Sequence, residues 1–507
     1  MSMWNPPRFE NEPTKDYAKG SPERAELVAA LQRAKQQQPA KIPLVVNGVT
    51  PERRRATDDH GSTTIQINSD TSTKQINPSR HGEAVAEYAS ATPQNVNAAI
   101  DAALRAKSVW ENMPFEDRAS IFLRACELIS TKHRAEVVAT TMLGQGKNIW
   151  HPRFTRPAHG TSSSIGRWKA SFIWKPSPSA LHSAWLLHKI LLEAGLPQDV
   201  IQFVPGDAET ITDTVLARRE FAGLSYIGST AVFKGLQRKI GNAIGDGVFA
   251  SYPRVVGETG GKNWTIVHAS ADIGSAVCNT VRSAFEYQGQ KCSALSRLYV
   301  AKSVWPDFRR QLQEQTALLQ VGDPENFENF INPVIHERSF DKLNEVIESA
   351  KSDPELELVA GGQASKEVGY YVHPTVYRTR NPKHDIMVRE LFGPILAVYV
   401  YDDDKWQETL GLLDGTSTYA LTGAIFARDP IASRQAQEVL KHAAGMLYLN
   451  TKCTGSVVAQ QPFGGSRDSG TNDKTGTMAH LQRFTSVRTI KEEFGSLSQV
   501  LYPSNEV

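Results

Sequence analysis

The chain has 507 residues, of which 40% are hydrophobic and 22% are charged, and its formal net charge is +2. This length allows two or three domains with a large core, and the near-neutral charge gives no indication of a nucleic-acid or acidic-membrane partner. No apolar run approaches the roughly 18 residues of a membrane span. The N-terminus has early acidic residues and no apolar core, so we expect neither a secretory signal nor a mitochondrial presequence.

The first predicted elements are helices, which occupy most of residues 22–147. Apolar residues recur at three- and four-residue spacing in residues 92–110 and 114–144, which is the helical period. An earlier helix is predicted to begin after Ser21, where Ser can cap the helix and Pro22 suits its first turn.

From Trp174 onward, short apolar runs alternate with helical patterns. The helical patterns cover residues 179–195 and 304–320. The strand-like runs are residues 200–206, 223–229, 263–270, 296–302, 395–403, 421–429 and 445–450. This alternation predicts a largely parallel sheet with binding crevices at the strand ends. Residues 151–172 are basic, rich in Ser, Gly and Pro, and aperiodic, so they are predicted to form an unusually long loop.

The cysteines are spread widely: Cys126, Cys278, Cys292 and Cys453. They form no C-x-x-C pair, so we expect no metal site and no disulfide scaffold, but reduced thiols in an intracellular compartment. Cys292 stands out because it lies in Gly-Gln-Lys-Cys-Ser, directly before a predicted strand. Small neighbours let backbone N–H groups face an anion formed on a substrate. From these residues alone, a buried structural cysteine is as good an interpretation as a nucleophile.

A candidate base lies 34 positions earlier, at Glu258, after a Val-Val run and before Thr-Gly-Gly. An acid in such a turn is usually solvated. Here the turn joins two strand-like runs, so the carboxyl group is predicted to lie at the mouth of a sheet. Partial burial there would raise its pKa toward the range that a general base needs.

Together, "GETGGKN" and "GQKCS" resemble the active site of the aldehyde dehydrogenase superfamily. Further motifs of that family follow in its order: "WKPS" at 174–177, "IGS" at 227–229, "RELFGP" at 389–394 and "QPFGGSRDSGTNDKTG" at 461–476. The segments 9–27, 144–148 and 454–476 are similar to one branch, the 1-pyrroline-5-carboxylate (glutamate-γ-semialdehyde) dehydrogenases. The resemblance covers residues 8–148 and about 173–495.

The resemblance implies an α/β aldehyde-dehydrogenase-like fold in three parts. A Rossmann-type dinucleotide domain with N-terminal helices would occupy residues 1–257 and be incomplete around 149–173. An α/β catalytic domain would follow at 258–455, and a return segment with a small oligomerisation arm at 456–507. The family also implies a homo-oligomer, a small-molecule substrate and no nucleic-acid or membrane partner. Its usual compartment is the mitochondrial matrix, and a cytoplasmic location is the alternative.

In this family, the matching cysteine attacks the aldehyde carbon, and hydride passes from the thiohemiacetal to NAD to leave a thioester. The matching glutamate activates the water that releases the acid. By resemblance these roles fall to Cys292 and Glu258. The implied NAD contacts are Lys175, Ser177, Gly228, Ser229, Glu390 and Phe392. The implied contacts of glutamate γ-semialdehyde, whose product is L-glutamate in proline catabolism, are Ser293, Gly455, Ser456 and Phe463.

The sequence departs from the family between Lys147 and Trp174, where members have several dozen more residues. That segment holds the first strand of the dinucleotide domain and a Pro-x-Asn-Phe turn whose Asn supports the oxyanion. Its loss is expected to cost about 100- to 1,000-fold in rate and to leave neighbouring strands unpaired, with exposed apolar faces. Three interpretations stay open: an active dehydrogenase of this semialdehyde, an impaired or non-enzymatic relative (or a defective gene model), and a dehydrogenase of another aldehyde.

Overall fold

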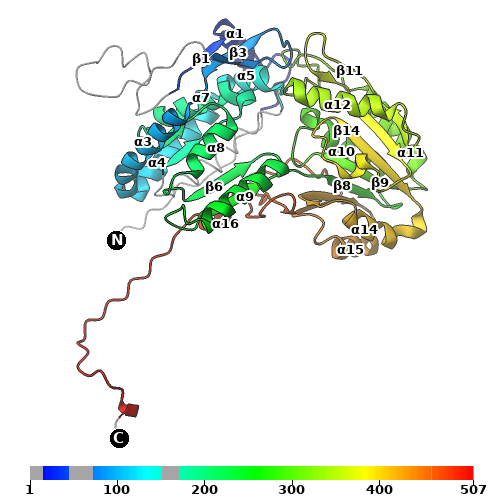
Figure 1. Cartoon of the computed structure of the whole chain (residues 1–507). Coiled ribbons are helices and arrows are strands. Elements are labelled where there is room, and N and C mark those ends of the chain that lie inside the picture. Colours follow the sequence, from blue (N-terminus) through cyan, green and yellow to red (C-terminus); the bar gives the residue numbers. More distant parts are fainter. Residues whose placement is uncertain (1–14, 45–71, 151–170, 458–459, 506–507) are drawn as a thin grey trace.

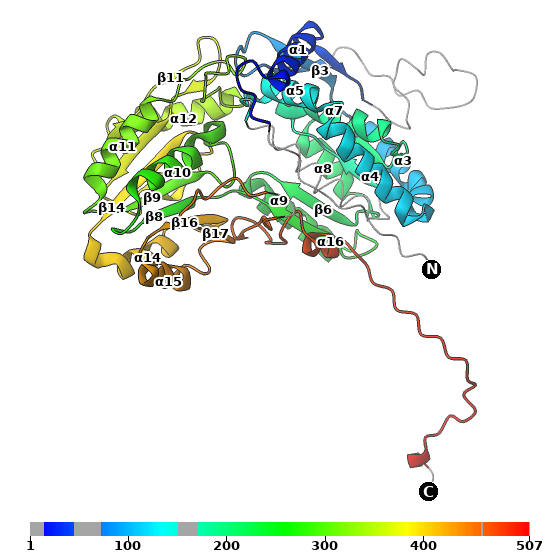
Figure 2. The same cartoon turned by 180° about the vertical axis from the view of Figure 1, so that it is seen from behind.

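The computed structural model describes residues 15–44, 72–150, 171–457 and 460–505. An N-terminal group of helices and a large sheet form two lobes, and the pair β6–β7 with α9 lies between them (Figures 1 and 2). The predicted long loop at 151–172 falls almost wholly outside the described residues. None of the described helices is long and apolar enough to cross a membrane.

The N-terminal lobe is built on the helices that the sequence predicts. Its main helices are α1 (Pro22–Gln36), α3 (Pro93–Asn112), α4 (Phe115–Ser130), α5 (Arg134–Gln145) and α7 (Leu181–Glu193). The start of α1 is confirmed, because the Ser21 hydroxyl accepts the Arg24 N–H at 3.3 Å and Pro22 occupies the first turn. The predicted helical region 114–144 forms two helices, α4 and α5, with a turn between them.

A three-stranded sheet in this lobe was not predicted. Its strands are β1 (Ala40–Ile42), β2 (Ser72–Ile76) and β3 (Ala84–Ala89), in the order β1-β3-β2. In β2 only Gln75 is buried, so this strand has no apolar alternation that the sequence could reveal. The strand β2 is therefore invisible to periodicity, which needs an apolar face.

The second lobe contains a seven-stranded sheet in the order β10-β13-β14-β9-β8-β16-β17. Its strands are β8 (Asn263–Val267), β9 (Leu295–Ala301), β10 (Leu356–Ala360), β13 (Thr375–Thr379), β14 (Ile395–Tyr401), β16 (Thr422–Phe426) and β17 (Met446–Leu449). All neighbours pair in parallel except β10 and β13. The five strands predicted between 263 and 450 are thus confirmed.

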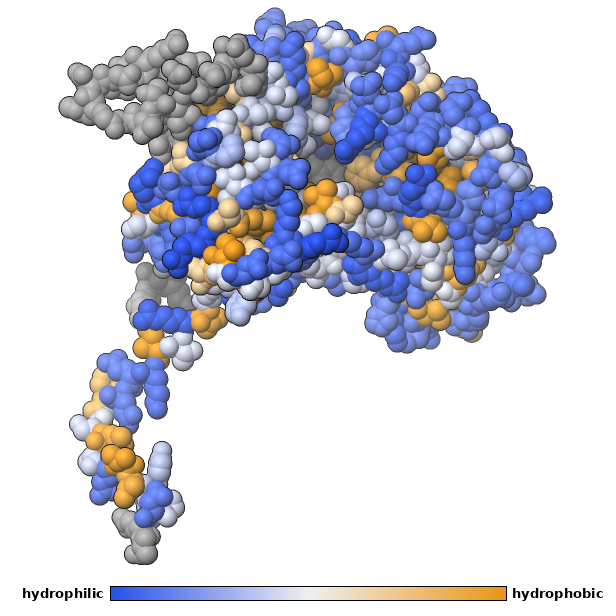
Figure 3. All heavy atoms as spheres, viewed as in Figure 1, coloured by the Kyte–Doolittle hydropathy of each residue, from blue (hydrophilic) through white to orange (hydrophobic). Residues whose placement is uncertain are grey.

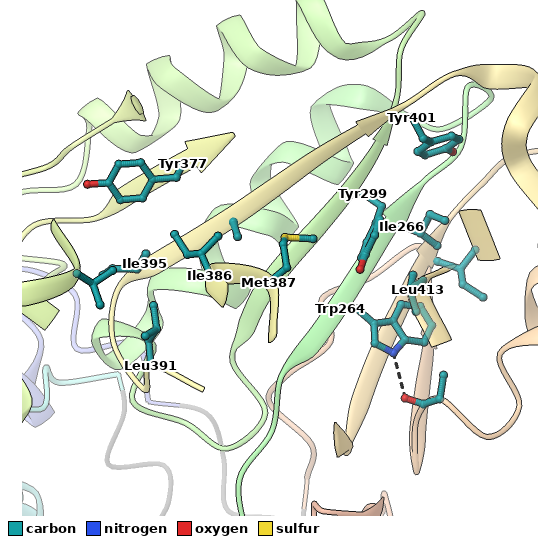
Figure 4. Packing of buried hydrophobic residues seen from close by; sticks show 14 of the residues in the cluster. Trp264, Ile266, Tyr299, Tyr377, Ile386, Met387, Leu391, Ile395, Tyr401 and Leu413 are labelled. Atoms are coloured by element: carbon teal, nitrogen blue, oxygen red, sulfur yellow. Dashed lines mark hydrogen bonds between the residues drawn. The ribbon is translucent and has the colours of Figure 1, made fainter. Parts of the chain in front are cut away.

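Two hydrophobic clusters hold helices on opposite faces of this sheet. One cluster includes residues of α10 (Ile273–Phe285) and α11 (Trp305–Ala317). The other includes residues of α12 (Glu337–Ala350), α14 (Trp406–Gly415) and α15 (Pro430–Val439). In the second cluster, the buried Trp264 indole donates a hydrogen bond to Ala443 O at 3.1 Å (Figure 4). The sheet is therefore a rigid base for loops that leave its strands.

The region expected to bind a dinucleotide contains two separate two-stranded parallel sheets. One pairs β4 (Phe172–Trp174) with β5 (Ile201–Phe203), and the other pairs β6 (Gly223–Ile227) with β7 (Arg254–Glu258). The helices α8 (Ala208–Leu216) and α9 (Thr230–Gly245) follow β5 and β6. Ile227, at the end of β6, is 72% exposed. Within the described residues, β6 pairs with β7 only. Loss of a neighbouring strand would leave such a strand with exposed apolar surface.

The C-terminal segment leaves the two lobes after α16 (Met478–Arg483) and extends away from them (Figure 1). Its apolar side chains are open to solvent (Figure 3). Val487 and Phe494 are each 92% exposed, and Leu497 is 90% exposed. The segment is mixed in character, because these exposed apolar side chains alternate with charged residues such as Arg488 and Lys491.

Candidate active site

Cys292 lies in a tight turn between α10 and β9, and the backbone before it is held in an unusual conformation. Tyr287 and Gln288 have φ values of 53° and 54°, in the left-handed region. Gln288 is fixed there because its side-chain amide donates to Gly146 O at 2.9 Å and to Pro333 O at 2.8 Å. Such strain clusters at functional sites, where the surrounding contacts must maintain it. The "GQGKN" motif at 144–148 thus supports the nucleophile turn, a role that the sequence did not reveal.

The Cys292 thiol is partly buried and faces two acidic groups. Burial first, and then the charges of Glu258 and Glu390, raise the pKa of Cys292 to about 12, whereas the N–H groups of Ser293 and Cys292 lower it. The thiol therefore carries its proton at neutral pH in this form of the protein. A thiolate is the reactive form of a cysteine nucleophile, and burial, together with the two nearby carboxyl groups, disfavours it here.

Glu258 is the last residue of β7 and is only 5% exposed. Burial raises the pKa of Glu258 to about 8, although the Lys474 ammonium group lowers it. Neither carboxyl oxygen accepts a hydrogen bond of ordinary geometry within the described part of the chain. The predicted rise in pKa is confirmed, and this carboxyl group can exchange a proton near neutral pH.

Gly228 and Ser229 lie beside Glu258 because β6 pairs with β7. The Gly228 N–H donates to Glu258 O at 3.2 Å. Ser229 caps α9, and its hydroxyl accepts the Val232 N–H at 3.4 Å, so the predicted strand-to-helix position is confirmed. Both residues are exposed. The N-terminus of a 16-residue helix that is open to solvent can bind phosphate oxygens.

The loop after Glu258 joins the nucleophile to Glu390. The Gly261 N–H donates to the Glu390 carboxylate at 2.7 Å. A Cβ atom on Gly261 would lie 2.3 Å from Cys292 O, and one on Gly260 would lie 2.4 Å from a Glu390 oxygen. A side chain at Gly261 would have to push the Cys292 carbonyl, whereas one at Gly260 would have to displace only the end of the Glu390 side chain. Burial raises the pKa of Glu390.

The remaining residues expected to contact NAD are divided between two places. Phe392 is 39% exposed with a φ of 55°, two residues beyond Glu390. Lys175 and Ser177 follow β4, in the other two-stranded sheet. Burial lowers the pKa of Lys175. The free helix N-terminus, the carboxyl group near the thiol and the exposed ring fit a dinucleotide whose phosphates lie on α9.

On the substrate side, Ser293 is 7% exposed and its hydroxyl lies 2.7 Å from that of Thr454. This contact joins the nucleophile turn to the segment with Gly455, which is exposed with a φ of +90°, and the half-buried Ser456. Hydroxyl and N–H donors in such a loop suit a carboxylate. The structure thus places Thr454, the residue before Gly455, against Ser293.

Phe463 approaches the site from the C-terminal segment. The next residue is Gly464, where a Cβ atom would lie 3.0 Å from a carboxyl oxygen of Glu258. Phe463 is partly exposed and its N–H donates to Thr475 O at 3.4 Å. The backbone of the Phe463–Gly464 segment therefore passes close to the candidate base.

Nothing in the sequence indicated a network of ion pairs around Glu286, which lies close to Cys292 in the chain. The Glu286 carboxylate accepts from Lys291 at 2.8 Å and from Lys452 at 3.0 Å. Burial raises the pKa of Glu286, but the charges of the two lysines outweigh this effect and lower the pKa to about 2. Both lysines flank site motifs in the sequence, but nothing local in their pattern indicates that they share one partner. These ion pairs fix the nucleophile turn against the 452–456 segment.

The other cysteines take no visible part in this arrangement. Cys453 is fully buried, with its sulfur 3.7 Å from Ser293 O. Burial raises the pKa of Cys126 and of Cys453 to about 11. Within the described ranges, no three His, Cys, Asp or Glu side chains are grouped to hold a metal ion.

A comparison with known protein families identifies the family of this chain. The aldehyde dehydrogenase family matches residues 65–158 and 169–490. The chain belongs to the aldehyde dehydrogenase family, and its fold is that of the family.

The chain is similar to several delta-1-pyrroline-5-carboxylate dehydrogenases. The mitochondrial enzyme of Emericella nidulans is 47% identical, with 99% of this chain and 94% of the relative covered. The human mitochondrial enzyme is 38% identical, with 97% and 93% covered. The crystal structure of the Mycobacterium tuberculosis delta-pyrroline-5-carboxylate dehydrogenase bound with NAD is 34% identical, has a TM-score of 0.90, and matches over 100% of both chains.

The match to the family is interrupted at residues 159–168, within the predicted long loop. The alignment with the Emericella nidulans enzyme extends over 556 positions, whereas this chain has 507 residues. At least 49 of those positions, the difference between the two lengths, therefore have no residue of this chain opposite them. This agrees with the expected absence of several dozen residues.

Proposed function

We propose that this protein oxidises L-glutamate γ-semialdehyde to L-glutamate with NAD. The observation that carries the proposal is the meeting of the Cys292 thiol, Glu258 and Glu390 around the Gly260–Gly261 turn, next to an open helix N-terminus. The names of the relatives supply the substrate, and the NAD-bound structure of the Mycobacterium tuberculosis protein supplies the cofactor.

In the proposed reaction, the Cys292 sulfur adds to the aldehyde carbon while the thiol proton passes to solvent water, which forms a thiohemiacetal with an anionic oxygen. The N–H groups near the sulfur stabilise the developing oxyanion. NAD, when bound, supplies the acceptor for the hydride that leaves the carbon, so that a thioester remains. Glu258 then takes a proton from water, the hydroxide adds to the thioester, and the Cys292 sulfur departs as glutamate is released.

In this proposal, one set of residues binds the cofactor and another set binds the substrate. NAD would be held by Lys175, Ser177, Gly228, Ser229, Glu390 and Phe392. The semialdehyde would be held by Ser293, Gly455, Ser456 and Phe463. Residues 1–257 would form the dinucleotide part, 258–455 the catalytic part and 456–507 the return segment and arm. The seven-stranded sheet, whose strands all lie between 263 and 449, supports the second boundary.

The pH dependence of turnover is expected to report Glu258. Only the ionised carboxyl group can accept a proton from water, and its pKa is raised to about 8 by burial, with Lys474 and Asp473 nearby. We therefore expect kcat to rise about tenfold per pH unit below pH 8 and to level off above it. A stopped-flow pH profile of the hydrolysis step checks this. A profile that is already flat at pH 6 would contradict it.

The proposed function is tested by NADH formation from purified full-length protein. We expect NADH with the semialdehyde, a much lower kcat/KM with butanal, which lacks the charged groups, and no NADH from Cys292→Ala. Equal kcat/KM for both aldehydes would identify a dehydrogenase of another substrate. No NADH from either aldehyde would overturn the proposal.

The split sheet favours a second candidate, a catalytically impaired protein or a defective gene model. Its support is the separation of β4–β5 from β6–β7, the exposed Ile227 and the alignment positions without a counterpart. Calorimetry with NAD tests impairment, because an incomplete dinucleotide sheet should bind it weakly. Sequencing the transcript across codons 146–174 tests the gene model. A message that matches this reading frame throughout would show that the gene model is not defective.

We further propose a homo-oligomer in the mitochondrial matrix. The exposed apolar residues of the C-terminal segment support self-association, since residues 483–494 resemble the arm that pairs with a neighbouring subunit. The word "mitochondrial" in the names of several relatives supports the compartment. Light scattering of the full chain, compared with a chain that ends at residue 483, tests the arm.

A further inference from the structure

Asn263 joins three neighbouring strands of the large sheet at the nucleophile. It is the first residue of β8 and is 2% exposed. Its side-chain amide donates to Cys292 O and to Ala294 O, both at 2.7 Å. Its side-chain oxygen accepts the Thr422 N–H, at the start of β16, at 3.0 Å. Because the Thr422 N–H can only donate and the two carbonyl groups can only accept, the orientation of this amide is fixed.

Gly261 also confines the Cys292 carbonyl, and it lies against the Asn263 amide as well, since a Cβ atom there would be 2.9 Å from the Asn263 side-chain oxygen. The Gly261 backbone lies so close that a Cβ atom there would be 2.3 Å from the Cys292 carbonyl oxygen. The C=O and N–H groups of one trans peptide unit point in opposite directions. A carbonyl of Cys292 that points to Asn263 therefore sends the Ser293 N–H to the opposite side. The Ser293 N–H does lie near the sulfur, since it is one of the groups that lower the pKa of Cys292.

We propose that Asn263 is a positioning residue for the nucleophile, which aims the Ser293 N–H at the Cys292 sulfur by holding the carbonyl groups of Cys292 and Ala294. Two simple replacements would lose these hydrogen bonds. Aspartate has the same shape but lacks the two donors, and alanine leaves two buried carbonyl groups without partners, which is costly. The inference about turnover rests on the proposed function, whereas the inference about the thiol does not.

The thiol is tested first, by alkylation of the full chain with iodoacetamide across pH, with modification of the Cys292 peptide measured by mass spectrometry. We expect Asn263→Ala and Asn263→Asp to react about tenfold more slowly at a given pH, which corresponds to a rise of one unit in the thiol pKa. The carboxyl groups that face the thiol, Glu258 and Glu390, remain in both variants. Alkylation at the wild-type rate by folded variants would overturn the proposal.

A matched control separates positioning from general loss of stability. Asn77 is also 2% exposed and its oxygen accepts the Ser79 N–H at 2.9 Å, but it lies in the N-terminal lobe. Asn77→Ala should lower Tm without changing the alkylation profile. Gly261→Ala serves if the Asn263 variants do not fold, because its methyl group pushes the same carbonyl and should also slow alkylation. An unchanged rate in folded Gly261→Ala would count against the proposal.

Turnover supplies the second measurement. We expect Asn263→Ala to lower kcat about 100-fold, in the range of a lost oxyanion donor, and to leave KM for NAD within about twofold. A loss in KM for NAD with unchanged kcat would overturn the positioning role. If the wild-type chain forms no NADH, the proposed function fails, and the alkylation experiment still decides the role of Asn263.

Discussion

Replacing Cys292 by serine is expected to lower kcat by about 10,000-fold or more, in the range seen when a covalent nucleophile is removed. The hydroxyl group is a much weaker nucleophile than a thiolate, and its ester would not be the activated intermediate that a thioester provides. Glu258 and Glu390 would further oppose formation of a negative charge at this position. The measurement is NADH formation with the semialdehyde, in both steady-state and single-turnover experiments.

Cys278→Ser is the matched control for this substitution. Cys278 is also a free cysteine, and it is exposed on α10, only fourteen positions from Cys292 in the sequence. It should retain wild-type activity. Activity in Cys292→Ser that is within tenfold of wild type would remove the nucleophile from its proposed place.

Replacing Glu258 by glutamine is expected to separate the two halves of the reaction. NADH should still form in a first burst, because the hydride leaves before water is needed. Steady-state turnover should fall about 100- to 10,000-fold, the usual contribution of a general base. Rapid-mixing absorbance measures the burst and the steady rate together. Loss of the burst together with the steady rate would place Glu258 before the hydride step.

The thermal stability of Glu258→Gln tests whether its slower turnover comes from unfolding. The folded-state pKa of Glu258, about 8, lies above its ordinary value of 4.5. As the pH rises between these two values, the unfolded chain loses this proton and the folded chain keeps it, so the ionisation favours unfolding. Glutamine removes that effect. We expect Glu258→Gln to have a Tm at pH 8 that equals or exceeds that of the wild type.

The sequence predicted the parts of the fold that have a strong local signal. The capped start of α1, the helices of the N-terminal lobe and five strands of the large sheet all carry apolar periodicity or clear end signals. The missed β2 buries one polar side chain, and β10 is mostly half-exposed, so neither presents an apolar face to detect. β13 was also missed, although four of its five residues are buried, because only Val376 and Tyr377 among them are apolar.

The candidate site shows the same division. Cys292 and Glu258 could be named because each lies in a distinctive motif. Asn263 and Glu286 act through partners that lie between 5 and 166 positions away in the sequence. Periodicity does not encode such contacts, which exist only after the strands have paired. The raised pKa of Cys292 likewise follows from burial of the thiol and from two carboxyl groups that folding brings near it.

The measurement that tests the central claim most directly is the position of the covalent intermediate. Full-length protein is incubated with the semialdehyde and NAD, quenched in acid and digested, and the acyl adduct is located by mass spectrometry. We expect the adduct on Cys292, and more of it in Glu258→Gln, where hydrolysis is slow. An adduct on Cys126, Cys278 or Cys453 instead would contradict the assignment of the nucleophile.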